Sequence, residues 1–523
     1  MGLRRIAAAV AAATLIAAGC GGEQRAGRAP ADPRAQAPVP WRPDGALDRV
    51  QRARALAARA ARRRAELERL AGVHTVPAAL RRALLSRAIG ERAHAGYRAA
   101  YRGARLAAGR LEGARGAEQA AALGAVERLA AAGLLTPSRL RPAFLNLRRN
   151  TRMWTRAPFP VAGERRSFGR HPAVFQYVPG QGMQLHPLAS WGRVNARLRR
   201  CLLTRGAACP ERRMRRQVDA LARLGARRGG FLAWEYQYAY AQGTPPWISG
   251  MAQATAVQAL SRAAHALDAA RYTRVARRAL GAFEAPPPTG VAVPAAAGTR
   301  YVMYSFAPPL QILNGELQAI NGLRDAAVLG RSARAERLVR RGDAAARAAL
   351  GGFDTGAWSL YSAAGAESTL SYHQLTTSIL VELCRRTERA AYCGAARRFA
   401  RYEREPPQIR IAPLRGLRAR RGSSLRFSLS KGAAVQVRVT AAGGVVLSHD
   451  GQLARGDHAL GWMPAARGRY RVRISARGPE GRVGVARTRV RVVLPRPRSP
   501  RAPRPGLVGE AVDPGLRQPR RRG

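Results

Sequence analysis

Two tyrosines, the second followed by a histidine, stand out in residues 353–374, whose sequence is FDTGAWSLYSAAGAESTLSYHQ. Tyr361, Tyr372 and His373 can donate and accept protons, whereas the flanking sequence is mostly Ala, Arg and Leu. Small residues between the tyrosines leave room for a ligand to approach the backbone, as in a loop that lines a cleft. The stretch therefore indicates acid–base chemistry, and tyrosines that only pack a core or a surface are the alternative.

A second stretch with polar and aromatic side chains is AVFQYVPGQGMQLHPLASWGRVNA, residues 173–196. Gln181 lies in a turn between two glycines, and His186 and Trp191 follow at the start of an expected helix. Aromatic faces stack on sugar rings, and amide groups bind sugar hydroxyls. The stretch thus suits a carbohydrate ligand, with aromatic packing of a loop onto helices as the alternative.

The charge of the chain is extreme for its 523 residues, a length that predicts about three folded units. Lys+Arg number 91 against 31 Asp+Glu, which gives a net charge of +60, and Lys431 is the only lysine. The arginines are spread along the chain instead of forming one stripe interleaved with aromatic residues, so we expect no nucleic-acid partner. Attraction of an anionic polymer, such as an acidic polysaccharide, fits this charge.

The N-terminal residues predict export. A basic start and an apolar run over residues 6–18 are typical of a signal peptide, and LIAAGC resembles a lipobox with Cys20 as the lipidated residue. We expect an extracytoplasmic protein that is held at the membrane by a lipid anchor, or else one that is secreted. No later stretch is apolar and long enough to predict a membrane span.

The other four cysteines form two closely spaced pairs, Cys201 with Cys209 and Cys384 with Cys393. An even count in an exported chain indicates two small disulfide loops, with buried thiols as the alternative. Neither pair has the spacing of a metal site, and we predict no metal and no cofactor.

The secondary structure expected to position these residues changes along the chain, as composition and apolar periodicity change. Ala/Arg/Leu-rich helical segments, among them single helices expected over residues 333–349 and 375–401, alternate with Gly- and aromatic-rich connections. This alternation is typical of an α/α toroid. From residue 408 the apolar period becomes two, which predicts a small antiparallel β-sandwich that resembles an immunoglobulin-like module, as a spacer or stabilising appendage or for carbohydrate binding. The fold class is mainly α, with these expected boundaries: signal peptide 1–20, disordered tether 21–45, helical region 46–136, toroid-like catalytic region 137–405, β-sandwich 406–494 and disordered tail 495–523. Residues 137–187, at the start of the catalytic region, are rich in Pro, Gly and aromatic residues and do not show a helical pattern.

Five sequence blocks occur in one order: AVFQYVPGQGMQLHPLASWGRVNA, PPWISGMAQATAVQALSRA, YVMYSFAPPLQILNGELQAINGL, FDTGAWSLY and SYHQLTTSIL. Together they resemble the D-glucuronyl C5-epimerase family, above all its C-terminal catalytic domain, over residues 170–405. The resemblance implies conversion of D-glucuronate to L-iduronate within a polysaccharide such as a heparan sulfate-like glycan, without a cofactor. Because carbon 5 loses a proton from one face and gains one on the other, two acid/base groups are needed.

The resemblance also implies roles for individual residues. Tyr361 and Tyr372 match catalytic tyrosines and would carry protons on opposite faces of the sugar, with Tyr304 or Tyr301 as a third tyrosine of the cleft. The residues implied to bind substrate are Tyr301, Asn314, His373, Gln181, His186, Trp247 and Gln253. Some arginine must hold the carboxylate while charge develops on it.

The chain departs from the family pattern at three positions. Val302 and Met303 stand where the animal enzymes carry acidic residues, and Ser362 replaces the acidic residue after the first tyrosine. Two other functions fit the same residues: a uronate polysaccharide lyase, which begins with the same proton abstraction, and a surface lipoprotein that binds acidic glycans without catalysis. The partner in each case is an acidic, uronate-containing polysaccharide, and a homodimer is one oligomeric state that the sequence allows.

Overall fold

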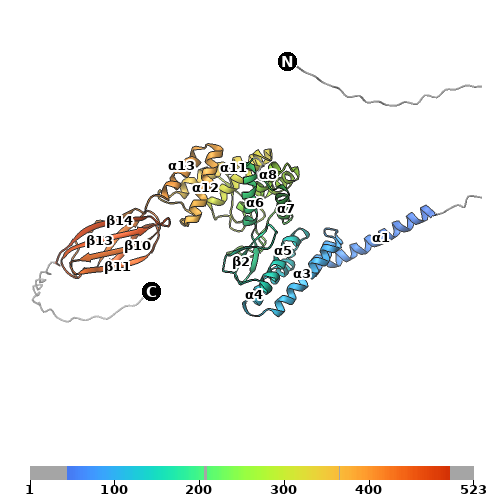
Figure 1. Ribbon diagram of the computed structural model, residues 1–523, viewed down its shortest axis with the longest axis horizontal. Helices are drawn as coiled ribbons and strands as arrows, with labels where there is room; N and C mark the ends of the chain where they lie inside the picture. The colour runs from blue at the N-terminus through green and yellow to red at the C-terminus, as the bar shows by residue number, and fades with distance from the viewer. Residues whose placement is uncertain (1–43, 205–208, 364, 495–523) are drawn as a thin grey trace, which may run out of the picture. The chain divides into compact units, whose positions relative to one another are not determined.

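The described part of the computed structural model forms thirteen α-helices and, at its C-terminal end, a region of antiparallel sheets (Figure 1). This agrees with the predicted mainly helical class and a C-terminal β-region. The described residues are 44–204, 209–363 and 365–494. The expected signal peptide, Cys20, nearly all of the tether and the tail lie outside them. Contacts divide the chain into residues 1–68 and 69–523, and each unit is described by itself.

The first unit contains most of helix α1 (Asp44–Leu70), which begins within the last two residues of the expected tether. Ala and Arg dominate the helix, and both have high helix propensity. Most of its described side chains are exposed, so propensity rather than burial favours this conformation.

The second unit begins with four helices around one hydrophobic core, to which Leu80, Tyr97, Leu129 and Phe144 contribute. These helices are α2 (Val76–Leu85), α3 (Glu91–Arg110), α4 (Gly113–Ala131) and α5 (Pro137–Arg156). Helix α5 was not expected from its proline and aromatic content. It forms because Pro137 occupies the first turn, where the missing N–H costs nothing.

A three-stranded antiparallel sheet follows, in the order β1 (Arg165–Ser167), β2 (Val174–Val178), β3 (Gly182–Leu185). The buried Glu118 of α4 holds the β2–β3 turn, because its carboxylate accepts hydrogen bonds from the Tyr177 hydroxyl and the backbone N–H groups of Gly180 and Gly182, each at 2.7 Å. Gly182 has φ +79°, and a Cβ there would lie 2.4 Å from Asn150 Oδ1. This turn therefore requires glycine.

Eight further helices share a second and larger core, in which α8 is buried on nearly all sides between α6 and α10. Gly322 of α10 permits that close packing, since a Cβ there would lie 2.3 Å from the carbonyl oxygen of Ala254. The eight are α6 (Pro187–Leu203), α7 (Glu211–Ala222), α8 (Gly250–Ala266), α9 (Ala270–Ala279), α10 (Leu313–Val328), α11 (Ala333–Ala349), α12 (Leu370–Thr387) and α13 (Ala390–Tyr402).

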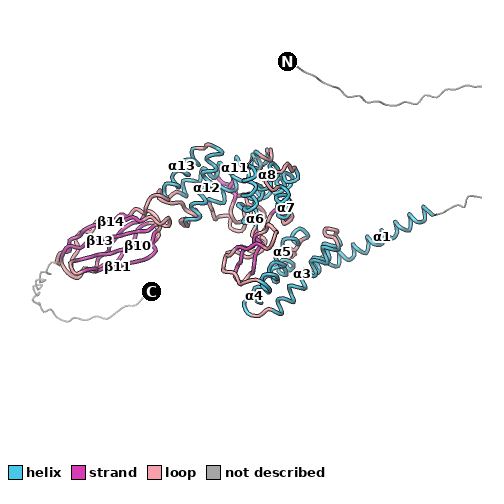
Figure 2. The backbone as a smooth tube through the Cα atoms, viewed as in Figure 1, coloured by secondary structure: helices cyan, strands magenta, loops and turns pink. Residues whose placement is uncertain are grey.

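Short hairpins and 3₁₀ turns connect these helices (Figure 2). They are β4 (Ala226–Arg228) with β5 (Phe231–Ala233), β6 (Ala292–Ala295) with β7 (Gly298–Tyr301), η1 (Leu280–Phe283) and η2 (Leu350–Phe353). One expected helix over residues 375–401 is in fact two, because Glu388 adopts a left-handed conformation with φ +54° and ends α12.

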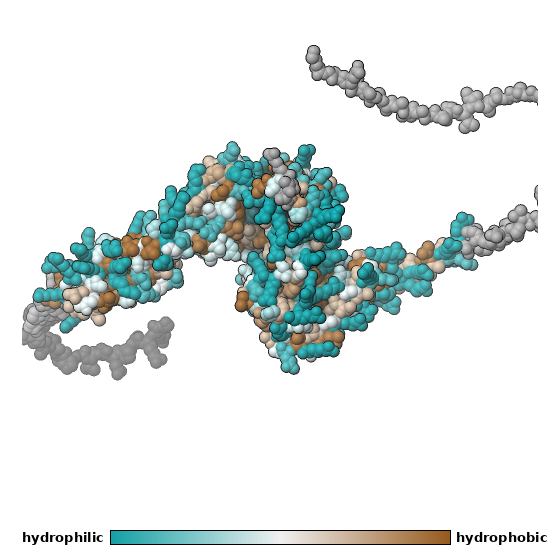
Figure 3. Space-filling model, in the orientation of Figure 1, coloured by the Kyte–Doolittle hydropathy of each residue, from teal (hydrophilic) through white to brown (hydrophobic). Residues whose placement is uncertain are grey.

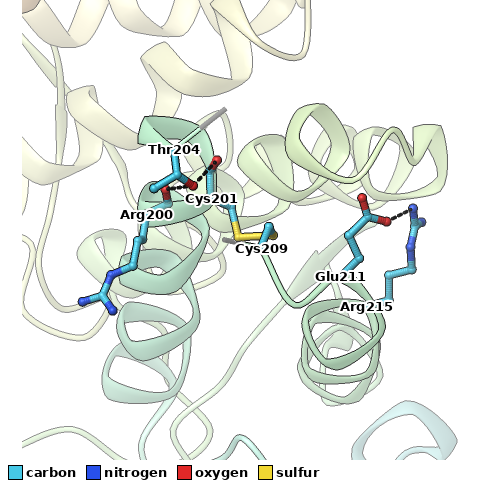
Figure 4. Close-up of a disulfide and its surroundings, with 6 residues drawn as sticks. All are labelled: Arg200, Cys201, Thr204, Cys209, Glu211 and Arg215. Atoms are coloured by element: carbon cyan, nitrogen blue, oxygen red, sulfur yellow. Dashed lines mark hydrogen bonds and ion pairs between the residues drawn. A yellow bond between two sulfur atoms is a disulfide. The ribbon is translucent and has the colours of Figure 1, made fainter. Parts of the chain in front are cut away.

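Two disulfides join consecutive helices, and they pair the cysteines that the sequence spacing groups together. Cys201, near the end of α6, is bonded to Cys209, just before α7 (Figure 4). Cys384 of α12 is bonded to Cys393 of α13. Each bond closes a connection between two neighbouring helices.

The C-terminal β-region consists of two antiparallel sheets, in the orders β11-β10-β13-β14 and β12-β9-β8. Period-two alternation, as predicted, turns residues such as Val437, Ile474 and Phe427 into one shared core. The strands are β8 (Ile409–Ile411), β9 (Ser423–Leu429), β10 (Ala433–Ala441), β11 (Gly444–Leu453), β12 (Gly456–Trp462), β13 (Gly468–Arg477) and β14 (Val483–Val492).

Hydrophilic side chains cover much of the face seen in Figure 3, with apolar residues scattered between them. None of the helices described here combines the length and apolarity that crossing a bilayer requires. The described chain likewise places no three His, Cys, Asp or Glu side chains where they could share a metal ion.

Candidate active site

A cavity of about 450 Å³ lies in the helical region, where the first turns of α6, α8, α10 and α12 meet β1, β2 and three connecting loops. Six of the ten residues expected to be catalytic or substrate-binding line it: Tyr304, Tyr361, Tyr372, Asn314, His186 and Trp247. The described lining contains no Asp and no Glu. Proton transfer on these walls therefore falls to tyrosine and histidine, and the paired carboxylates of glycoside hydrolysis are not among them.

Three tyrosines of the cavity lining are neighbours in a row. The rings of Tyr361 and Tyr372 are in contact, with centroids 4.7 Å apart and planes tilted by 49°. Tyr304 lies beyond Tyr361 and packs against Tyr240 at 5.5 Å. Tyr372 is 42% exposed, whereas Tyr304 and Tyr361 are partly buried. The row thus runs from a sheltered end at Tyr304 to an open end at Tyr372.

The loop between η2 and α12 positions the middle of this row. Its backbone folds on itself, since the Tyr361 N–H donates to the Ala366 carbonyl at 2.6 Å and Ala363 donates to the Gln311 carbonyl before α10. Thr369 caps α12 by accepting from the Tyr372 N–H at 3.4 Å. Tyr361 and Tyr372 are therefore fixed by two different local structures that end at the same wall.

Burial sets the protonation state of the tyrosine row. Burial, together with the neighbouring Tyr361 and Tyr240, raises the pKa of Tyr304 well above its ordinary value. Burial and then the proximity of Tyr372 raise the pKa of Tyr361 in the same direction. Both phenols hold their protons at neutral pH, so they are ready to donate a proton, and a phenolate forms more readily as the pH rises.

An aromatic wall lies beside the row, and of its four residues only Trp247 was expected from the sequence. It consists of Tyr236, Tyr238 and Tyr240 with Trp247, and the Tyr236 and Trp247 rings stack at 4.1 Å with planes 6° apart. The sequence signal was the spacing of two in EYQYAY, which brings the tyrosines to one site despite the irregular backbone. Such a wall offers flat apolar faces to a ring-shaped ligand.

Polar groups face the cavity from the remaining side. Arg165 of β1 is the one arginine of the described lining, and its Nε donates to Gln176 Oε1 at 3.1 Å. Burial and the charge of Arg165 lower the pKa of His186 to about 4, so this imidazole is neutral at pH 7. His186 Nδ1 accepts from the Ala189 N–H at 3.1 Å, which leaves its proton on Nε2. The side supplies a cation and a neutral N–H donor.

Asn314, in the first turn of α10, carries a polar atom that lacks a protein partner. The residue is 1% exposed, and its Oδ1 makes no hydrogen bond within the described chain. A buried amide oxygen without a partner costs free energy. A ligand hydroxyl in the cavity would satisfy it.

The other four expected residues do not line the cavity, because their polar groups are already bonded within the protein. The Tyr301 hydroxyl donates to the Leu338 carbonyl at 2.7 Å, and Gln253 bonds the backbone of Trp234 in both directions. Gln181 bonds both backbone groups of Ala239. These three therefore hold neighbouring loops in place instead of facing a ligand.

His373 is likewise a supporting residue. It is fully buried, its Nδ1 lies 2.7 Å from Ser359 Oγ, and its Nε2 lies 3.0 Å from the Phe399 carbonyl oxygen. The ring stacks on Trp358 at 3.8 Å. His373 thus fastens the loop before α12 to α12 and α13. Of the positions that depart from the family pattern, Met303 lines the cavity while Val302 and Ser362 are buried.

The arrangement combines a helical region with a cavity of about 450 Å³ whose acid/base side chains are tyrosines and a histidine. Residues 228–401 match the family model of the D-glucuronyl C5-epimerase C-terminus, and this part of the chain belongs to that family. The match supports an epimerase-type function for this part of the chain. A search among curated proteins found no match. Arg165, Gln176 and His186 precede the matched residues, so the cavity combines side chains from inside and outside the family segment.

Proposed function

We propose that the protein inverts carbon 5 of D-glucuronate units in an acidic polysaccharide, giving L-iduronate. The observation that carries the proposal is the tyrosine row, Tyr304–Tyr361–Tyr372, on the wall of a cavity whose described lining has no carboxylate. Epimerisation beside a carboxylate needs proton carriers and a clamp for developing negative charge, and it needs no catalytic carboxylate. The match to the epimerase family supports the same reaction.

An anionic sugar is favoured by the electrostatics of the cavity. Four helices begin at its wall, and a helix N-terminus carries a partial positive charge. Arg165 would hold the uronate carboxylate, His186 Nε2–H would donate to a sugar oxygen, and Asn314 Oδ1 would accept from a sugar hydroxyl. The aromatic wall supplies the stacking face.

The proton path follows from the ring contact of Tyr361 and Tyr372. A pyranose between two rings needs ~3.5–4.0 Å on each side, and the 4.7 Å between these centroids leaves no such space. We therefore assign the two faces of carbon 5 to the outer tyrosines, Tyr304 and Tyr372. One, as phenolate, takes the C5 proton, and the other donates its hydroxyl proton to the opposite face. Tyr361 then carries a proton between them and restores the starting state.

The wider setting belongs to the same proposal. We propose that the protein is exported and tethered through Cys20, so that it meets an extracytoplasmic polysaccharide. The helices would close as an α/α toroid, and the two C-terminal sheets would form an immunoglobulin-like sandwich. A glycan of the heparan sulfate type is one substrate with the required uronate.

The decisive experiment replaces Tyr372 with Phe and follows C5 exchange on a glucuronan in deuterated water. Tyr372→Phe removes one hydroxyl at the open end of the row, and we expect exchange to fall by at least about a thousandfold because one face loses its proton carrier. Polymer binding, measured by calorimetry, should change by less than about twofold, since uniform binding contacts remain.

Arg165→Gln serves as the comparison, because it removes a binding group and leaves the tyrosines intact. We expect this variant to weaken substrate binding, with a KM at least about tenfold higher, because the cation that holds the carboxylate is lost. Full exchange in Tyr372→Phe would exclude the proposed path. A conjugated product that absorbs in the ultraviolet would instead indicate elimination, and hence a lyase. Binding without exchange or absorbance would indicate a glycan-binding protein.

A further inference from the structure

The only lysine of the chain occupies a buried position in the C-terminal β-region. Lys431 lies in the turn between β9 and β10 and is 1% exposed. All other basic side chains among the 91 Lys and Arg are arginine. Where arginine is used throughout, a single lysine indicates a place where a guanidinium does not fit.

The contacts of Lys431 show why an ammonium is needed there. Its Nζ donates to the carbonyl oxygens of Tyr402 at 2.8 Å and Glu405 at 2.7 Å, and it lies 3.0 Å from Glu480 Oε1. It also lies 4.8 Å from the ring centroid of Trp358. Two carbonyl acceptors and one carboxylate charge surround the compact ammonium, whereas a planar guanidinium is larger and spreads its donors in one plane.

The same turn touches the loop that carries Tyr361. Gly432 N–H donates to Glu367 Oε2 at 2.8 Å, and Arg455 Nε lies 3.7 Å from Glu367 Oε1. Glu367 is paired across the loop with Leu360, the residue before Tyr361. The turn therefore holds both arms of the loop, one through Glu367 and the other through Trp358.

Trp358 extends this connection to the helix that carries Tyr372. Its Nε1 donates to the Ser368 carbonyl at 2.8 Å, and its ring stacks on His373 in the first turns of α12. Lys431 faces the tryptophan ring. A cation over an aromatic ring is attracted to it more strongly when both are buried away from water.

We propose that residues 430–432 are a positioning element of the active site, through which the C-terminal β-region fixes the loop of Tyr361 and the start of α12. The β-region is thus a working part of the enzyme instead of an appendage. It lies beyond residue 401, the end of the family segment. The effect on turnover rests on the proposed epimerase function, while the effect on the loop does not.

The test uses the full chain with Lys431→Met combined with Glu480→Gln, which removes both buried charges together. We expect kcat for C5 exchange to fall about tenfold with KM within about twofold, because tyrosine placement and not polymer binding is disturbed. Amide hydrogen exchange in residues 358–372 should become at least about tenfold faster. Arg471→Met, an exposed change in the same region, is the control and should alter neither quantity.

Unchanged kcat and unchanged amide exchange in the folded double variant would overturn the proposal. A rise in KM alone would overturn it too, since this would assign the β-region to polymer binding. If the double variant does not fold, Glu367→Ala, which removes the acceptor of the Gly432 N–H together with the ion pair to Arg455, is measured in the same way. If the wild type exchanges no C5 proton, the proposed function fails, and loop protection still decides whether the turn holds the loop.

Discussion

Tyrosine is a demanding choice as a base because a buried phenol gives up its proton reluctantly. The raised pKa values of Tyr304 and Tyr361 mean that phenolate is scarce at neutral pH. The same property makes each phenol a competent proton donor, which inversion needs on the second face. In the proposed reaction, these raised pKa values would favour proton donation and make proton abstraction the slower half.

This imbalance predicts the pH dependence of exchange. The active form needs one phenolate, whose fraction grows with pH below the phenol pKa, so we expect kcat/KM to rise by roughly tenfold per unit between pH 7 and 9. His186, with its pKa lowered to about 4, stays neutral over this range and adds no further ionisation to the pH–rate profile. A flat or falling profile, with the melting temperature constant over the same range, would contradict a tyrosine base.

The sequence could predict part of the cavity lining but not which polar groups are already bonded within the protein. Tyr361, Tyr372 and Asn314, which the sequence singled out, line the cavity. His373 looked equally reactive, yet nothing in its neighbours along the chain shows that Ser359 and Phe399 occupy both ring nitrogens. Arg165 could not be selected among so many arginines, because only the fold brings β1 to the wall.

At the scale of elements, a buried carboxylate joins the N-terminal helices to the cavity. Glu235 accepts from Arg139 Nε of α5 at 2.7 Å and Nη2 at 2.8 Å, and from Arg228 Nη1 of β4 at 2.9 Å. Glu235 directly precedes Tyr236 of the aromatic wall. The pair of arginines thus locates the wall relative to α5.

Loss of the Glu235 carboxylate should destabilise the fold. Glu235→Gln leaves two largely buried guanidinium groups without a counter-charge, and we expect the free energy of unfolding to fall by about 3–5 kcal/mol. Urea denaturation followed by circular dichroism measures it. Glu336→Gln is the control, because its partner Arg340 is exposed and such pairs contribute about 0–1 kcal/mol. Equal losses in both variants would contradict the assigned importance of burial.

Helical periodicity could be recognised in the sequence, whereas the residues at which helices end were harder to predict. The expected helix over residues 333–349 coincides with α11, where Ser332 caps the first turn. The boundary between α12 and α13 was missed because Glu388 adopts positive φ without being glycine. Local rules therefore predicted the elements, while tertiary contacts decided where several of them end.

At the scale of the molecule, the net charge of +60 should govern encounter with an acidic polymer. Dispersed charges act at long range and are screened within ~8–10 Å at physiological salt. We expect KM for a long glucuronan to rise by about tenfold between 50 and 500 mM NaCl, while kcat stays constant. A disaccharide or tetrasaccharide, which spans fewer charges, should show a weaker dependence. An equal dependence for short and long substrates would limit the effect to the cavity itself.

The sheet β1–β3 determines how short a fragment of this protein could be and still contain the whole cavity lining. Arg165, Gln176 and His186 reach the cavity from that sheet and its outgoing turn, and Glu118 fastens the sheet to α4. A fragment cut at residue 228 would carry the tyrosines without Arg165 and His186, which the proposed reaction needs to bind the uronate. Transfer of the activity by recombination must therefore begin upstream of α2, and the portable unit is larger than the family segment.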